Sequence, residues 1–162
     1  MATQIINHNT STTKPVTKAV FRMPAYQLLC MQTWKGIAYT VEFQRVFDML
    51  INYVHKGRAI IEVIDSSRLG TPHGRNGNVP SPITLMRNDP LVMEEIRSNL
   101  GIPVRDGVRI NPNIDFVRSM RRAFQAKTIR GACVSCSFNE MCTRVSDQGF
   151  ADAKLKLGQP QP

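Results

Sequence analysis

The spacing of apolar residues along the chain predicts several helices and few strands. The clearest helix covers residues 40–56, where apolar residues recur every three or four positions. Thr40 can cap its start, and Lys56 followed by Gly57 is typical of a helix end. The apolar positions of this helix are Phe43, Val46, Phe47, Leu50 and Val54. Such a strip predicts a helix that packs on the core of the protein.

Weaker signals complete the expected secondary structure. Asp89-Pro90 and Leu100-Gly101 are typical of the start and end of a helix, and Asn111-Pro112 precedes another helical pattern. We also expect a first helix near Pro24, a strand over residues 59–64 and a tight hairpin over residues 104–108. The sequence therefore predicts a mainly α fold with a few short strands (α+β). Its core would be built by helices 40–56, 89–100 and 113–127.

The chain of 162 residues is the size of one domain. Residues 1–20 are rich in Thr, Asn and Ser and predict a flexible, weakly basic arm. A mitochondrial transit peptide is the alternative, but such peptides are rich in Arg, and none precedes Arg22. We expect a single globular domain over residues 21–146 and a polar C-terminal tail over 147–162.

Charge indicates the kind of partner. The formal net charge is +9, which favours an acidic partner, with nucleic acid first and an anionic membrane surface second. There is no run of about 18 uncharged apolar residues to span a membrane and no apolar core of a secretory signal. We therefore expect an intracellular protein, either cytoplasmic or nucleoid-associated, that does not use a membrane.

Three of the four cysteines lie close together, as Cys133, Cys136 and Cys142. In a reducing compartment clustered thiols bind metal more often than they form disulfides, although disulfides or free thiols are the alternative. Ser137 and Glu140 have the spacing of a capping box, which predicts a helix that brings Cys142 back toward the first pair. The sequence thus predicts a C-terminal metal site over residues 133–142.

A fourth ligand is needed, and Cys30 is the remaining cysteine. His55 and His73 are alternatives if the metal is zinc. Zinc sites usually combine two close pairs of ligands, whereas one pair, a third thiol and a remote cysteine suit an iron–sulfur cluster better. We expect a 4Fe–4S cluster, with zinc as the alternative.

A distant cysteine followed by C-x2-C-x5-C resembles the 4Fe–4S clasp of AddB-type helicase–nucleases and CRISPR-associated RecB-like exonucleases. Phe138, two residues after Cys136, is also similar, and WhiB-type regulators and endonuclease-III-type glycosylases have comparable spacing. The nuclease families place an Asp and a Glu-x-Lys at their metal; here Glu62-Val63-Ile64 lacks the Lys. WhiB-type regulators have a Gly-Trp turn that is missing here, and the glycosylases have a cysteine where this chain has Ala126. The resemblance implies the cluster and not the enzymes' chemistry.

Basic residues flank the cysteines. Arg118, Arg121 and Arg122 are expected on one face of the helix over 113–127, opposite an apolar face. Lys127, Arg130 and Arg144 continue the positive charge, and a solvated helix face is the alternative interpretation. Arginine side chains suit phosphate oxygens, so these residues are the predicted nucleic-acid contacts.

Our first hypothesis is a metal-stabilised protein that binds DNA or RNA without catalysis. The second is an iron–sulfur electron-transfer protein whose basic surface docks an acidic protein. The third is an accessory or degenerate nuclease subunit.

Overall fold

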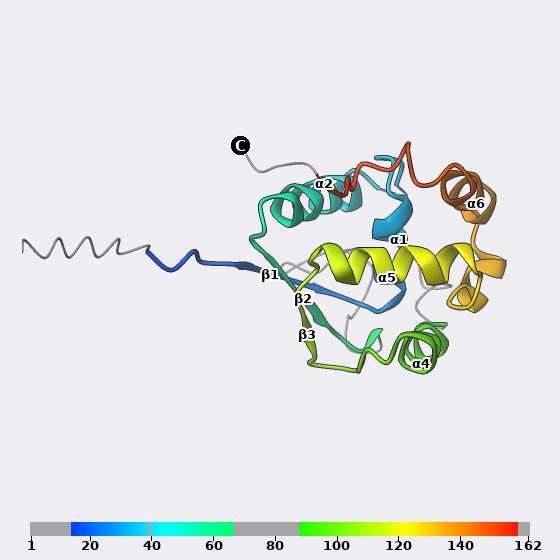
Figure 1. The fold of residues 1–162 in the computed structure, drawn as a ribbon, viewed down its shortest axis with the longest axis horizontal. Coiled ribbons are helices and arrows are strands. Elements are labelled where there is room, and N and C mark those ends of the chain that lie inside the picture. Colours follow the sequence, from blue (N-terminus) through cyan, green and yellow to red (C-terminus); the bar gives the residue numbers. More distant parts are fainter. Residues whose placement is uncertain (1–13, 39, 67–87, 159–162) are drawn as a thin grey trace, which may run out of the picture.

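A computed structural model describes residues 14–38, 40–66 and 88–158. The elements follow in the order β1 (Ala19–Met23), α1 (Tyr26–Cys30), η1 (Met31–Thr33), α2 (Val41–His55), β2 (Ala59–Val63), α4 (Asp89–Leu100), β3 (Arg109–Ile110), α5 (Ile114–Gln125), η3 (Gly131–Ser135) and α6 (Asn139–Asp147). The fold is mostly helical with one small sheet, as the sequence predicted (Figure 1).

The sheet has the strand order β1-β2-β3, with β1 parallel and β3 antiparallel to β2. Phe21 and Met23 of β1 are buried beside Ile61 and Val63 of β2, while alternate side chains face away from this core. β1 was missed by the sequence analysis, which assigned residues 19 and 20 to the flexible arm. Its five residues are too few to show a clear alternation, and their place is fixed by pairing with β2.

The predicted helices form close to their expected limits. The Thr40 hydroxyl accepts a hydrogen bond from the N–H of Phe43, 3.1 Å away, at the start of α2. Gly101, with φ 65°, ends α4 in the left-handed conformation that glycine adopts without strain. The first predicted helix is short, because α1 gives way to the 3-10 turn η1 before Trp34.

Two local predictions were wrong. Asp106 and Gly107 form a turn, but the strand after it pairs with β2 instead of closing a hairpin over residues 104–108. The helix expected just after Cys136 does form as α6, but its N-cap is Phe138, whose side chain makes no capping hydrogen bond, and not Ser137 as expected from the capping box.

Residues 147–158 do not form the polar tail that was expected. Phe150, Ala153 and Leu155 are buried, and the N–H of Lys154 donates to the carbonyl of Trp34 at 2.7 Å. This C-terminal segment runs back across the body toward α2 (Figure 1). Apolar residues spaced two or three apart are a weak pattern in isolation, and their burial depends on the surface that they meet.

No helix within residues 14–38, 40–66 and 88–158 combines the length and the apolar character needed to cross a membrane.

Candidate metal centre

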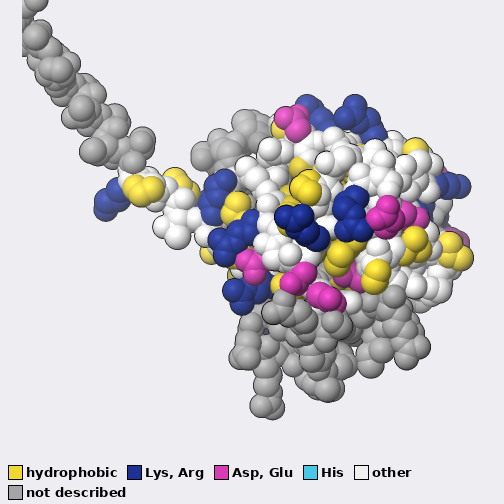
Figure 2. Space-filling view, turned by 90° about the horizontal axis from the view of Figure 1, so that it is seen from below, with side chains coloured by type: hydrophobic (Ala, Val, Ile, Leu, Met, Phe, Trp, Pro, Cys, Tyr) yellow, Lys and Arg dark blue, Asp and Glu magenta, His cyan; other side chains and the backbone are white. Residues whose placement is uncertain are grey.

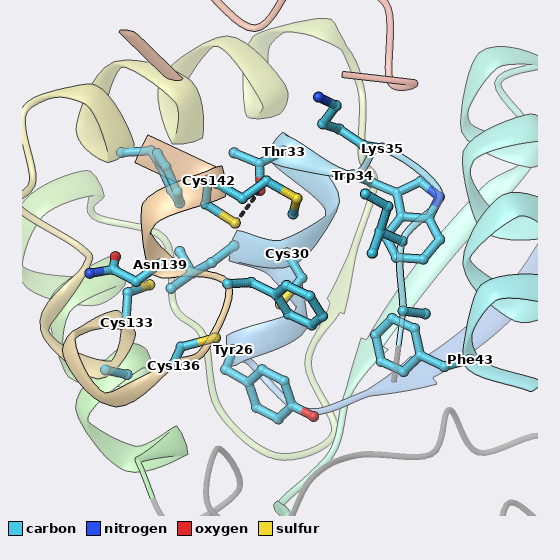
Figure 3. A pocket seen from close by; sticks show the side chains of 17 residues that line it. Tyr26, Cys30, Thr33, Trp34, Lys35, Phe43, Cys133, Cys136, Asn139 and Cys142 are labelled. Carbon is cyan, nitrogen blue, oxygen red and sulfur yellow. Dashed lines mark hydrogen bonds between the residues drawn. The ribbon is translucent and has the colours of Figure 1, made fainter. Parts of the chain in front are cut away.

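Four cysteines from three separate parts of the chain line one pocket. Cys30 ends α1, Cys133 lies in η3, Cys136 follows η3 and Cys142 lies in the first half of α6. Figure 3 shows their side chains around this pocket, which has a volume of about 70 Å³. We call it the thiol pocket. The structure thus brings Cys30 to the three C-terminal cysteines, as the sequence analysis expected.

Short backbone hydrogen bonds position the three C-terminal cysteines. The N–H of Cys136 donates to the carbonyl of Cys133 at 3.0 Å, and the N–H of Asn139 donates to the carbonyl of Cys136 at 3.0 Å. The N–H of Cys142 then donates to the carbonyl of Phe138 at 2.9 Å. These turns fold the C-x2-C-x5-C segment tightly, so all three thiols can face α1.

Arg130 holds this segment together from the side. One guanidinium nitrogen, Nη2, lies 2.6 Å from Oδ1 of Asn139 and 2.7 Å from the hydroxyl of Thr143. The guanidinium carbon also lies 4.4 Å from the centre of the Phe124 ring. Arg130 therefore ties the start of η3 to α6 and to α5. It was predicted to contact phosphate, but it is only 8% exposed and is used inside the protein.

Burial favours the neutral form of three thiols in the pocket, those of Cys30, Cys133 and Cys142. Burial raises the pKa of the Cys30 thiol, and negative charge on Cys142, Cys133 or Cys136 would raise it further. Burial also raises the pKa of Cys133 to about 11, although the nearby Arg130 acts in the opposite direction. For Cys142 burial again raises the pKa, and a hydrogen bond from Thr33 partly offsets it. Thiolates in this pocket would need a compensating positive charge, which a bound metal supplies.

All four cysteines are free thiols. Among residues 14–38, 40–66 and 88–158, no group of three or more His, Cys, Asp or Glu side chains is arranged so that it could hold a metal ion. The thiols therefore line a common pocket without converging on one point. As a donor set they suit soft metals, because thiolate is the ligand of iron–sulfur clusters and of many zinc sites.

The histidine alternatives for a fourth ligand do not reach the thiol pocket in the described structure. His55 lies at the end of α2 and lines a different pocket, where its Nε2 accepts a hydrogen bond from the N–H of Lys156 at 2.9 Å. His73 lies outside the described residues.

The predicted nucleic-acid contacts divide into two groups. Arg118, Arg122, Lys127 and Arg144 are exposed, whereas Arg121, like Arg130, is only 8% exposed. Nη2 of Arg121 donates to the carbonyls of Leu155 at 2.6 Å and Gln32 at 3.3 Å. The prediction of one basic face was therefore wrong for Arg121, because the C-terminal segment covers that side of α5.

Sequence reasoning missed Thr33, whose buried hydroxyl lies 3.2 Å from the sulfur of Cys142. No local pattern could have indicated it, because Thr33 is far from Cys142 in the sequence. Glu62, the candidate nuclease carboxylate, forms ion pairs with Arg22 at 3.2 Å and Arg109 at 2.9 Å across the sheet.

Comparisons of the chain with protein-family models, with curated proteins and with solved structures gave no match, so its own geometry is the basis for interpretation.

Proposed function

We propose that this protein carries a 4Fe–4S cluster on Cys30, Cys133, Cys136 and Cys142 and binds nucleic acid without catalysis. One observation carries the first half of the proposal. The remote Cys30 lies in the same pocket as the three C-terminal thiols. Four free thiols from separate parts of the chain that line one pocket are the donor set that a metal centre uses.

The arrangement of the thiols favours a cluster over a single zinc ion. Structural zinc needs four ligands at about 2.0 to 2.3 Å from one point. A cluster with several irons and sulfides is larger, so its cysteines attach around a body instead of meeting at a centre. The four thiols line one pocket without meeting at a single point, which corresponds better to attachment around a cluster. When bound, the cluster would join α1, η3 and α6 and supply one-electron chemistry.

Charge supports the second half of the proposal. The chain has 21 Lys and Arg residues against 12 Asp and Glu, and Arg118, Arg122, Lys127 and Arg144 are exposed. Contacts between such side chains and phosphate oxygens carry affinity without sequence information. A nuclease function is less well supported, because both neighbouring arginines already neutralise Glu62.

Anaerobic purification tests the cluster directly. We expect a brown protein with broad visible absorption and about four irons and four sulfides per chain. A colourless protein with one zinc per chain would replace the cluster with a zinc site, and a metal-free protein with disulfides would end the metal proposal. Binding of short DNA and RNA over a salt series then tests the nucleic-acid half separately.

Electron transfer to an acidic protein is the second candidate function. Val134, between Cys133 and Cys136, is 79% exposed, and Ile37 at the rim of the thiol pocket is 51% exposed. Exposed apolar residues beside a redox centre are suited to docking a partner. Reversible reduction of the cluster together with no nucleic-acid binding at low salt would favour this function.

A further inference from the structure

A second, larger cleft lies apart from the thiol pocket and has a volume of about 550 Å³. Three lysines line it from three parts of the chain: Lys18 before β1, Lys56 at the end of α2 and Lys156 in the C-terminal segment. We call it the lysine cleft. Lys56 and Lys156 were not among the predicted nucleic-acid contacts, because only the tertiary structure places them beside Lys18.

Hydrogen bonds fix the walls of the lysine cleft. The bond from the N–H of Lys156 to Nε2 of His55 attaches the C-terminal segment to the end of α2. The N–H of Ala19 donates to the carbonyl of Arg58 at 2.8 Å, which holds the chain next to Lys18 against the start of β2. The lysine backbones are therefore positioned before a ligand binds, which lowers the entropic cost of binding.

The lining of the cleft suits an anion. None of the described residues that line it is Asp or Glu, whereas the three lysines each carry a positive charge. Nε2 of His55 accepts a hydrogen bond and therefore carries no proton, so the imidazole is neutral and adds no positive charge to the cleft. The N-cap residue of α5, Asn113, also lines the cleft, so the positive end of a 12-residue helix faces the same region.

The shape and the floor of the cleft narrow the class of anion. Its volume lies within the range of about 300 to 1,000 Å³ that is usual for ligand sites. Buried Val117 and Leu155 contribute an apolar floor, and the amides of Asn52 and Asn111 add polar positions. A positive rim over an apolar floor is complementary to a phosphate ester that carries an organic group.

The basic surroundings favour a strand over a small molecule. Figure 2 shows several Lys and Arg side chains, with acidic side chains among them, at the end of the body from which the N-terminal segment extends. Lys18 of the cleft belongs to this segment, and Lys14 lies four residues before it. Positive charge that continues beyond a cleft can follow the successive phosphates of a chain.

We propose that the lysine cleft binds the phosphates of single-stranded nucleic acid. This inference rests on the proposed nucleic-acid function and names a contact surface for it. It is independent of the metal centre, whose ligands do not line this cleft.

The test compares two variants that lose equal charge. Lys18→Gln/Lys56→Gln removes two exposed cations from the cleft, and Arg45→Gln/Arg105→Gln removes two exposed cations that do not line it. Lys156 is kept, because its Nζ lies 2.6 Å from the carbonyl of Ala151 and its loss could disturb the fold. The probe is a fluorescent single-stranded oligonucleotide, titrated at several salt concentrations.

We expect the cleft variant to reduce the slope of log K against log salt by about 1.4, or 0.7 for each phosphate contact, while the control keeps the wild-type slope. If the cleft variant kept the wild-type slope, or if both variants lost the same amount of slope, the inference would be overturned. Binding by the wild type would still leave the proposed function intact. Thermal stabilisation by inorganic phosphate or a mononucleotide forms a second arm. The cleft would serve a free phosphate compound if these ligands stabilised the wild type but not the cleft variant and if no oligonucleotide bound. In that case both proposals of strand binding would fail. No binding of any probe by the wild type would overturn both as well.

Discussion

The hydroxyl of Thr33 lies 3.2 Å from the sulfur of Cys142, although 109 residues separate them in the sequence. Figure 3 shows this contact at the edge of the thiol pocket, between the 3-10 turn after α1 and α6. Thr33 is 2% exposed, so little water competes for its hydroxyl. The contact connects the segment that carries Cys30 to the segment that carries Cys142.

Replacing Thr33 with Val should remove this hydrogen bond with little change of volume. We expect the unfolding free energy of the metal-free protein to fall by about 1 kcal/mol. In the metal-loaded protein the reduction potential should become more negative, because hydrogen bonds to cluster sulfurs stabilise the reduced state. Urea unfolding and a redox titration measure the two effects. Thr33→Ser keeps the hydroxyl and should retain the wild-type potential; equal shifts in both variants would contradict this role.

Replacing Cys30 with Ser tests whether the remote thiol is a ligand. We expect loss of most of the visible absorption and iron, since a 4Fe–4S cluster ordinarily needs four protein ligands. Ser135→Ala, an exposed position between Cys133 and Cys136, is the control and should retain both. Iron and sulfide analysis after anaerobic purification gives the answer. Unchanged iron content in Cys30→Ser would place the fourth ligand elsewhere.

Asp89 predicts a pH dependence of stability. The side chain is fully buried, and its Oδ1 accepts a hydrogen bond from the N–H of Tyr26 at 2.7 Å. Burial raises the pKa of Asp89 from an ordinary value of 3.8 to about 6, and the charge of Asp65 adds to the rise, whereas hydrogen bonds from the backbone oppose it. Because the folded state binds the proton of Asp89 more tightly than the unfolded state does, protonation of Asp89 stabilises the fold. This stabilisation is fully present below pH 4 and is lost as the pH rises to about 6.

The change corresponds to about 3 kcal/mol at most, at 1.36 kcal/mol for each pKa unit. Asp89→Asn keeps an oxygen for the N–H of Tyr26 but cannot ionise. We therefore expect the variant to gain stability relative to the wild type as the pH rises from 4 to 7. Urea unfolding of both proteins at several pH values measures the difference, in which other titrating groups cancel. A difference that stays constant with pH would show that Asp89 ionises normally.

Arg121 and Arg122 are neighbours in the sequence with opposite expected effects. Arg121→Met should destabilise the protein by about 2 to 4 kcal/mol, because the buried carbonyls of Leu155 and Gln32 lose their shared donor. The contact of its guanidinium with the Phe150 ring, 4.6 Å away, would also be lost. Arg122→Met, at an exposed position, should change stability by less than about 0.5 kcal/mol. Thermal or urea unfolding of the two variants measures the two changes in stability. Similar losses in both variants would contradict a structural role that belongs to Arg121 and not to Arg122.

The sequence by itself determined the local elements whose signals are contained within a few turns of chain. α2, α4 and α5 follow from apolar spacing and from the residues at their ends, such as Thr40 and Gly101. The spacing of Cys133, Cys136 and Cys142 also marked the candidate site, because a turn between the first two thiols and a helix that carries the third bring all three to one region.

Only the tertiary structure decided which distant segments meet. It paired the short strand β1 with β2, buried Phe150 and Leu155 of the expected tail, and turned Arg121 and Arg130 inward. It also placed Cys30 and Thr33 beside Cys142, and gathered Lys18, Lys56 and Lys156 around one cleft. The physical reason is the same in each case. Helical spacing and caps depend on neighbours three or four residues away, whereas burial, pairing and charge clustering depend on surfaces that exist only after the chain has folded.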